Sequence, residues 1–261
     1  MCELIKFWNK LNLNPNNNKF IHPEDENTLG QVDKKCLTFD DYVKDPNNLF
    51  GDNFILHTGL IPVPYAGNIS RASIYLLLIN PGLHHNDYYS EYQNDEYKMS
   101  LINNLKQKNL DNDYPFLFLN PKFSHTSGGE YWINKFKAII IKLKTEKNID
   151  YKESLKLLAQ NVCTLELFPY HSINFKLSKS VINSCPSIIK MRDFVKTLSH
   201  SNRDLYIFCL RQPTNWNLEE KNNNDNFIIL PPKQRQAASL TTKTNAGQKI
   251  FDILSNKLAK K

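Results

Sequence analysis

The sequence has little of what membrane spans, disulfide frameworks or zinc ribbons require. No apolar run in its 261 residues approaches the roughly 18 of a membrane-spanning helix, and the amino terminus has no signal-peptide pattern. The five cysteines are odd in number, far apart and never in a Cys-x-x-Cys pair, which argues against a disulfide framework or a zinc ribbon. We therefore expect reduced thiols, a cytoplasmic location and no membrane partner.

Motifs for phosphate loops and metal sites are also missing. Glycine is scarce, with 8 residues, and no Gly-x-x-x-x-Gly-Lys loop is present. His84, His85 and Asp87 are close in sequence, but neighbouring residues rarely converge on one ion, and no second cluster has ligand spacing. We expect neither a metal nor a cofactor.

What the sequence does have is a sizeable supply of core residues and an excess of positive charge. Hydrophobic residues make up 41% of the chain, with 15 Phe and 12 Tyr, enough to bury a large core. The formal net charge of +7 favours a polyanionic partner, although a lysine-rich, solvated surface would give the same charge.

An apolar segment at residues 72–79 runs directly into Asn80-Pro81-Gly82-Leu83. The segment is too short for a membrane span, and it lacks the alternation of apolar and polar residues of a strand with one solvent-exposed face. It therefore predicts a central strand of a parallel sheet. Pro81 ends ladder hydrogen bonding, and Gly82 permits a positive φ or the close approach of a ligand. Asn80 is then expected at the carboxyl edge, where open α/β sheets bind ligands. The same three residues are also common in ordinary turns, so the motif alone leaves both interpretations open.

Three further segments, 162–168, 205–210 and 226–230, also have strand character. Helical patterns over 127–143, 152–160 and 187–198 precede or separate them, and a closing helix begins near Asn245. This alternation predicts an α/β fold, a three-layer α/β/α sandwich around a four-stranded, mainly parallel sheet. Because polar residues follow every strand, Asn80 and His171 should meet at one edge.

The first part of the chain is predicted to be an extension packed on this core. Residues 2–11 have helical spacing, and a helical turn follows Thr38. The prolines in 61–67 predict an extended strap leading into the central strand. We expect an extension over residues 1–60 and an α/β domain over 61–261.

Residues 84–92 are dense in histidine and tyrosine and predict a loop beside the ligand edge. Exposed aromatic faces there would suit the stacking of a nucleobase, and packing of the loop on the sheet is the alternative. Glu166, inside an apolar strand, either faces the pocket with a raised pKa or reaches solvent at the rim.

The order of these parts resembles the uracil-DNA glycosylase superfamily. The strand followed by Asn80-Pro81-Gly82-Leu83 is similar to the first motif of its mismatch-specific uracil/thymine branch. Tyr92 falls at about the spacing of the family's base-stacking aromatic residue. The sequence departs from the family at the exit of the fourth strand, where Leu230 stands in place of a histidine and Lys233 and Arg235 follow. Residues 168–172, Phe-Pro-Tyr-His-Ser, also differ from the family's uracil-reading segment.

The resemblance implies a monofunctional, metal-independent DNA glycosylase that flips a damaged or modified base and hydrolyses its N-glycosidic bond. Asn80 would position the attacking water and His171 would donate to the leaving base; for His171, a role in capping a turn is the structural alternative. We expect a monomer with DNA as its partner. The base-binding candidates are Pro81, Gly82, Tyr88, Tyr92, Glu166 and Tyr170, and the DNA-binding candidates are His84, Ser172, Arg211, Lys233, Arg235, Ser239 and Thr241.

Two other classes of function stay open at this point. The fold could serve as a catalytically inactive module that binds DNA or protein, which the missing histidine of the fourth strand favours. The site could also act on a small nucleotide or nucleoside, since glycine-containing strand exits suit phosphates.

Overall fold

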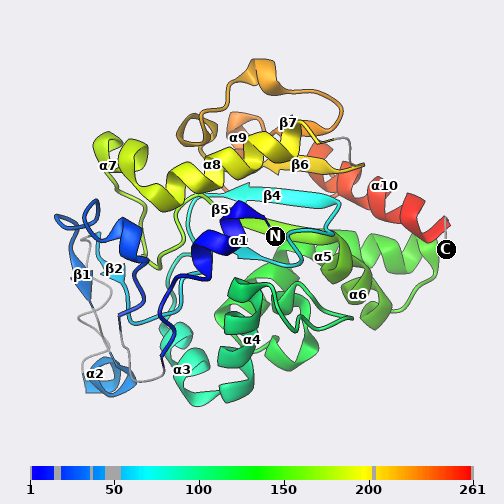
Figure 1. The fold of residues 1–261 in the computed structure, drawn as a ribbon. Coiled ribbons are helices and arrows are strands. Elements are labelled where there is room, and N and C mark those ends of the chain that lie inside the picture. Colours follow the sequence, from blue (N-terminus) through cyan, green and yellow to red (C-terminus); the bar gives the residue numbers. More distant parts are fainter. Residues whose placement is uncertain (1, 15–18, 36–37, 45–53, 202–203, 260–261) are drawn as a thin grey trace. The chain divides into compact units, whose positions relative to one another are not determined.

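The computed structural model describes residues 2–14, 19–35, 38–44, 54–201 and 204–259 (Figure 1). The chain divides into two compact units, each assembled from three separate stretches. The first unit comprises Met1–Tyr65, Ile79–Lys108 and Glu166–Ser201, and the second comprises Ala66–Leu78, Asn109–Leu165 and Asn202–Lys261. The division into residues 1–60 and 61–261 stays a prediction.

The second unit is built around a mixed sheet, so the chain is of the α/β class (Figure 1). All four predicted strands are present, as β4 (Ile74–Leu78), β5 (Val162–Glu166), β6 (Tyr206–Cys209) and β7 (Phe227–Ile229). The described residues add a fifth strand, β3 (Tyr65–Ala66), and the order is β3-β5-β4-β6-β7. The expected number of four strands is therefore corrected to five. The additional strand comes from the segment predicted to be an extended strap.

Most of the sheet is parallel. β4 pairs with β6, and β6 with β7, in parallel register. Hydrogen bonds from Ser73 N to Asn161 O and from Phe168 N to Ile79 O, at 3.0 and 2.9 Å, run in the parallel sense along β4 and β5. At the edge, Glu166 N donates to Pro64 O and Val63 N donates to Pro169 O, which is the antiparallel sense.

The sheet has a topological switch point. Along the chain β4 is followed by β5 on one side and then by β6 on the other, so the direction in which strands are added reverses between β4 and β6. All five residues of β4 and of β5 are buried, as expected of strands covered on both faces. The predicted burial of the apolar run at 72–79 is therefore confirmed.

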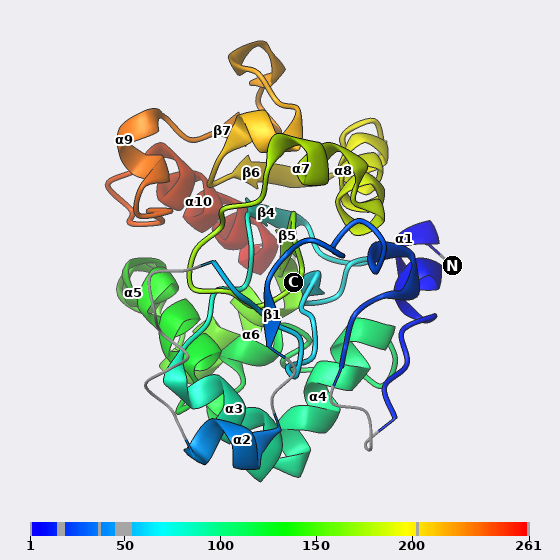
Figure 2. The ribbon, with the colours of Figure 1, turned by 90° about the vertical axis from the view of Figure 1, so that its left-hand side faces the viewer.

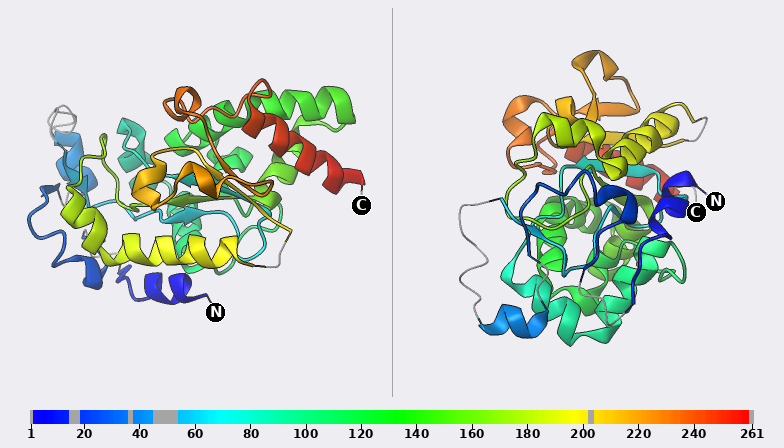
Figure 3. Two further views of the ribbon diagram at one scale, coloured as in Figure 1. Left: turned by 90° about the horizontal axis from the view of Figure 1, so that it is seen from above. Right: turned by 60° about the vertical axis from the view of Figure 1, so that its left-hand side comes forward.

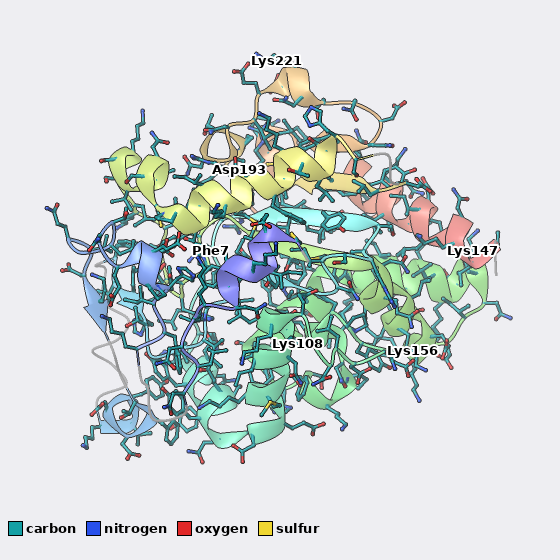
Figure 4. The ribbon with its side chains drawn as sticks, in the orientation of Figure 1. Phe7, Lys108, Lys147, Lys156, Asp193 and Lys221 are labelled. Carbon is teal, nitrogen blue, oxygen red and sulfur yellow. The ribbon has the colours of Figure 1, made fainter. Side chains whose placement is uncertain are left out.

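Three helices of the second unit, α5 (Ser127–Lys147), α6 (Tyr151–Asn161) and α10 (Asn245–Ala259), contact one another along one side of the sheet (Figures 1 and 3). Thr126 caps α5 by accepting from Gly129 N at 3.1 Å, and Asp150 caps α6. The remaining elements of the unit are short: η3 (Leu117–Leu119), η4 (Pro121–Phe123), η5 (Pro213–Trp216), η6 (Glu220–Asn222) and α9 (Pro232–Arg235). Figure 4 shows Lys147 and Lys156 on the outer sides of α5 and α6.

The first unit is mostly helical. Its elements are α1 (Glu3–Trp8), η1 (Pro23–Asp25), β1 (Lys34–Lys35), α2 (Phe39–Lys44), β2 (Leu56–His57), α3 (His85–Gln93), α4 (Asp95–Lys106), α7 (Lys179–Ser184) and α8 (Pro186–Ser199). Helix α1 packs beside α8 (Figure 2), and its Phe7, labelled in Figure 4, stacks on His22 at 3.6 Å between ring centroids.

The histidine- and tyrosine-rich segment is a helix, so the prediction of a loop over 84–92 is wrong. His84 Nδ1 accepts from Asn86 N at 3.2 Å, while the Asp87 carboxylate accepts from His84 N at 2.6 Å. This reciprocal capping starts α3, and Tyr88 and Glu91, three residues apart, form its buried face. The polar residues that suggested a loop are the helix cap.

None of the described helices has both the length and the apolar character needed to cross a membrane. Cys2, Cys163, Cys185 and Cys209 are free thiols, and Cys36 lies outside the described residues.

Candidate functional site

The candidate site in the first unit is built on the turn that follows β4. Asn80 lies two residues beyond the end of the strand and is half-buried. Its Nδ2 donates to Ser172 O at 3.0 Å and to Ser172 Oγ at 3.1 Å. A carbonyl oxygen can only accept, so this pair of bonds fixes which end of the amide faces Ser172. Among the described residues nothing donates to Asn80 Oδ1, and this carbonyl oxygen is left to orient a substrate or a water molecule.

Gly82 gives the turn its shape. Its φ of +75° lies in the left-handed region, where a side chain is disfavoured. A Cβ at this position would meet nothing within 4 Å. Glycine is therefore needed for the backbone conformation and not for space, and the turn presents Gly82 O to the side chain of His171 at 3.0 Å.

His171 connects the turn to the strap before β3. Its Nδ1 lies 3.0 Å from Gly82 O and its Nε2 lies 3.1 Å from Ile61 O. Its own carbonyl accepts from His57 N at 2.9 Å. Both ring nitrogens face oxygens that only accept, and only the doubly protonated imidazolium can donate to both. The predicted meeting of Asn80 and His171 is observed, but in this arrangement the ring has no free N–H to direct at a leaving base.

Glu91 belongs to the same group of residues, and it was not among the residues predicted from the sequence. It is 3% exposed, and both carboxyl oxygens accept from Ile61 N, at 3.0 and 3.1 Å. Burial raises the pKa of Glu91 to about 8, so the carboxyl is neutral at pH 7. One feature of the sequence could have indicated the burial of Glu91: it lies three residues after Tyr88, so in a helix both side chains fall on the same face.

Ile61 thus joins a buried acid to the histidine of the site. Its N–H donates to Glu91, and its C=O faces His171 Nε2. The chain of contacts runs from Glu91 through Ile61 and His171 to Gly82, one residue past the Asn80-Pro81 pair. The position of the turn therefore depends on groups spread over more than 100 residues of sequence, all within the first unit.

The tyrosines predicted to stack on a base pack against each other and against α2. Tyr88 is 1% exposed; its ring stacks on Tyr42 at 4.7 Å and its hydroxyl lies 3.0 Å from His57 Nδ1. Tyr92 is half-buried, stacks on Tyr88 at 6.1 Å and donates to Gly59 O at 2.7 Å. Tyr89, at 48% exposure, is the tyrosine of α3 with an accessible ring.

Glu166 and Tyr170 are also in the interior. Glu166 ends β5 and is 6% exposed. Tyr170 donates to the Asp25 carboxylate at 2.6 Å and accepts from His22 N at 3.0 Å. Burial, and then the negative charge of Asp25, raise the pKa of Tyr170 well above its ordinary value. Asp25 also accepts from Ser187 N at 2.9 Å, so Tyr170 belongs to a buried network at the start of α8.

The predicted DNA-binding residues fall in the second unit, apart from His84, which caps α3, and Ser172, which accepts from Asn80 Nδ2. Lys233 on α9 is exposed. Arg235 is engaged inside the unit, since its Nε donates to Leu230 O and its guanidinium lies 3.9 Å from the Glu220 carboxylate. The other candidates lie at or after strand exits: half-buried Arg211, half-buried Ser239 and exposed Thr241.

Comparisons of the chain with protein-family models, with curated proteins and with solved structures gave no match. In the described part of the chain, no group of three or more His, Cys, Asp or Glu side chains is placed to hold a metal ion. The case for a function therefore rests on the geometry of these residues.

Proposed function

We propose that the chain is a DNA glycosylase-like hydrolase in which Asn80 positions the water that attacks C1′ of a flipped nucleotide. The fold in this proposal is a three-layer α/β/α sandwich of the uracil-DNA glycosylase type. One observation carries the proposal: an amide held by its nitrogen, with its oxygen unengaged, at the carboxyl end of the central strand.

The reaction breaks the bond between C1′ and the base nitrogen and forms a bond from C1′ to the water oxygen. The transition state resembles an oxocarbenium ion with negative charge on the departing base. Asn80 Oδ1 accepts a hydrogen bond from the water and aims its lone pair at C1′, and the water proton passes to the departing base or to solvent. An amide cannot take up that proton, so the contribution of Asn80 is orientation, worth several kcal/mol where the geometry is fixed in advance.

His171 acts in this proposal as a positioning residue. Both ring nitrogens face backbone carbonyls, and through Gly82 O the ring holds the turn that carries Asn80. Stabilisation of the leaving base is then assigned to groups other than this ring. Positive charge for the DNA backbone comes from the net charge of +7 and from exposed side chains such as Lys233.

The test is a panel of oligonucleotides, each with one modified or mismatched base, scored for alkali-labile abasic sites. On a base that the native protein releases, Asn80→Ala should reduce the single-turnover rate by about 100-fold or more. DNA affinity and the melting temperature should change little. Asn86→Ala on α3, which removes an exposed amide, is the matched control and should keep full activity.

Ser172→Ala refines the test, because it removes one of the two acceptors for Asn80 Nδ2 and leaves the backbone carbonyl. We expect a loss smaller than that of Asn80→Ala. Full activity of Asn80→Ala on a verified substrate would refute the role of Asn80 in the reaction.

A second candidate is a catalytically inactive DNA-binding module on the same fold. Two observations favour it: the ring nitrogens of His171 are engaged, and Tyr88 is buried in aromatic packing. Duplex binding without release of any base in the panel would identify this candidate.

A further inference from the structure

The positive charge of the chain is confined to the second unit. This unit has 19 Lys and Arg residues against 11 Asp and Glu residues, a formal net charge of +8. The first unit, which holds Asn80 and His171, has 14 against 15 and is close to neutral. A charge excess of this kind attracts polyanions and does so more strongly at low salt. The surface that a polyanion contacts is therefore expected in the second unit.

Helix α5 carries a dense part of this charge. Its residues 131–145 include four lysines and no acidic residue. The lysines form two pairs, Lys135 with Lys137 and Lys142 with Lys144. The pairs are seven residues apart, which is close to two turns and about 10 Å along a helix axis. The same two sides of the helix are therefore charged twice.

The two lysines of each pair differ in their surroundings. Lys135 donates to a backbone carbonyl, and Lys142 donates to Gln248 Oε1 of α10 at 2.7 Å. Lys137 and Lys144 are exposed, and within the described residues neither forms a hydrogen bond or an ion pair. These two ammonium groups are therefore open to a partner from solution.

The exposed lysines share the outer face of α5. Lys137, Ile141 and Lys144 are spaced by four and three residues, so they lie on one side of the helix, and Ile141 is 51% exposed. The wide apolar face that a helix needs to lie in a membrane surface is buried inside the unit. It consists of Trp132, Phe136, Ile139, Ile140 and Leu143. The outer face thus offers two cations with one aliphatic side chain between them.

We propose that the outer face of α5 binds the phosphate backbone of duplex DNA through Lys137 and Lys144. Duplex DNA carries one negative charge per about 1.7 Å of its axis, so two ammonium groups about 10 Å apart can each reach a phosphate. Contacts of this kind hold the duplex and read no sequence. The proposal rests on the proposed function only for the identity of the polyanion as DNA, and the surface lies wholly within the second unit.

The experiment measures the affinity of the full chain for an unmodified duplex oligonucleotide over a series of salt concentrations. The double variant Lys137→Ala/Lys144→Ala should bind about tenfold more weakly at low salt. Its slope of log affinity against log salt should be smaller by about 1.8, because two phosphate contacts are lost. The melting temperature should change little, since alanine favours helix and neither ammonium contacts the fold.

The matched control removes the same two charges from the first unit. Lys190 and Lys196 are exposed on α8, and Lys190→Ala/Lys196→Ala should keep the native slope. Lys137→Arg/Lys144→Arg, which keeps both charges, should also keep it. Equal losses of slope in the two alanine variants would overturn the proposal, because the effect would then belong to net charge and not to α5.

Vesicles rich in phosphatidylserine test the other anionic partner. Vesicle binding that falls in Ile141→Ser and in the α5 alanine variant, with duplex affinity unchanged in both, would overturn the proposal in favour of a membrane surface. The duplex carries no modified base, so its binding is scored without base release. Base release by the native chain with an unchanged slope in the α5 alanine variant would refute this proposal and leave the proposed function standing. The expected slopes without any base release would do the reverse.

Discussion

The buried carboxyl of Glu91 should make the stability of this protein fall as the pH rises through neutrality. Its pKa of about 8 in the folded chain compares with an ordinary value of 4.5. Below pH 4.5 the carboxyl is protonated whether the chain is folded or not. Between pH 4.5 and 8 the unfolded chain releases the proton and the folded chain keeps it, so the free energy of unfolding decreases with pH. Above pH 8 both states are ionised and the dependence ends.

The size of this effect follows from the difference between the two pKa values. Linkage converts it into up to about 5 kcal/mol, lost gradually over that window. Glu91→Gln keeps an oxygen that accepts from Ile61 N and cannot ionise. The free energy of unfolding of this variant should therefore lack the decrease with pH that Glu91 causes. The variant should be close to the native chain near pH 4.5 and more stable than it by several kcal/mol at pH 9.

The assay is urea denaturation at pH values from 5 to 9, with the difference between native and Glu91→Gln chains plotted against pH. Background titrations common to both chains cancel in this difference. Glu130→Gln, which changes an exposed acid at the start of α5, is the control and should run parallel to the native chain. Parallel curves for the native chain and Glu91→Gln would refute the reasoning.

Five other substitutions, in three tests, probe the stability of the fold and the DNA-binding charge. Gly67→Ala should lower the free energy of unfolding by well over 2 kcal/mol, because its φ is +104° and the new Cβ would lie 2.5 Å from a backbone oxygen. Gly82→Ala meets no neighbouring atom and is strained only by its positive φ, so it should cost about 1 kcal/mol. Equal losses of stability in urea denaturation would contradict this distinction. Tyr170→Phe breaks the buried hydrogen bonds of the hydroxyl to Asp25 and His22 N, one of them to a carboxylate, and should cost more than Tyr88→Phe, which removes the hydroxyl beside His57. The reverse order of denaturation midpoints would contradict the buried network. Lys233→Ala should lower the salt slope of DNA binding by about 0.7 to 0.9 with an unchanged melting temperature, and an unchanged slope would place the DNA contact elsewhere.

The sheet was largely predictable because its signals are local. Short apolar runs between turn residues favour strands covered on both faces, which led to the predictions 72–79, 162–168, 205–210 and 226–230. The observed strands lie inside these ranges, at 74–78, 162–166, 206–209 and 227–229. Helix α5 was equally visible, since Trp132, Phe136, Ile139, Ile140 and Leu143 repeat at helical spacing and are all buried. The number of strands was not visible, because β3 is two residues long and follows prolines.

Helix α3 was missed because of its polar cap. His84 and Asp87 look like loop residues, but in the folded chain His84 Nδ1 accepts from Asn86 N and the Asp87 carboxylate accepts from His84 N, which caps the first turn of the helix. With the segment taken as a loop, its tyrosines were assigned to an exposed stacking surface. In the folded chain Tyr88 is stacked on Tyr42, a partner 46 residues away that no local pattern indicates.

The placement of Asn80 at the carboxyl edge of a central strand, near His171, could be predicted from the sequence. Both positions follow from strand direction, which is set by the order of strands and helices along the chain. The hydrogen-bond partners of these side chains became known only from the tertiary structure. The ring of His171 is occupied by the carbonyls of Gly82 and Ile61, and burial raises the pKa of Glu91 to about 8 despite the hydrogen bond from Ile61 N. Hydrogen-bond partners and pKa values depend on groups distant in sequence, and the packing of the chain brings those groups within hydrogen-bonding distance.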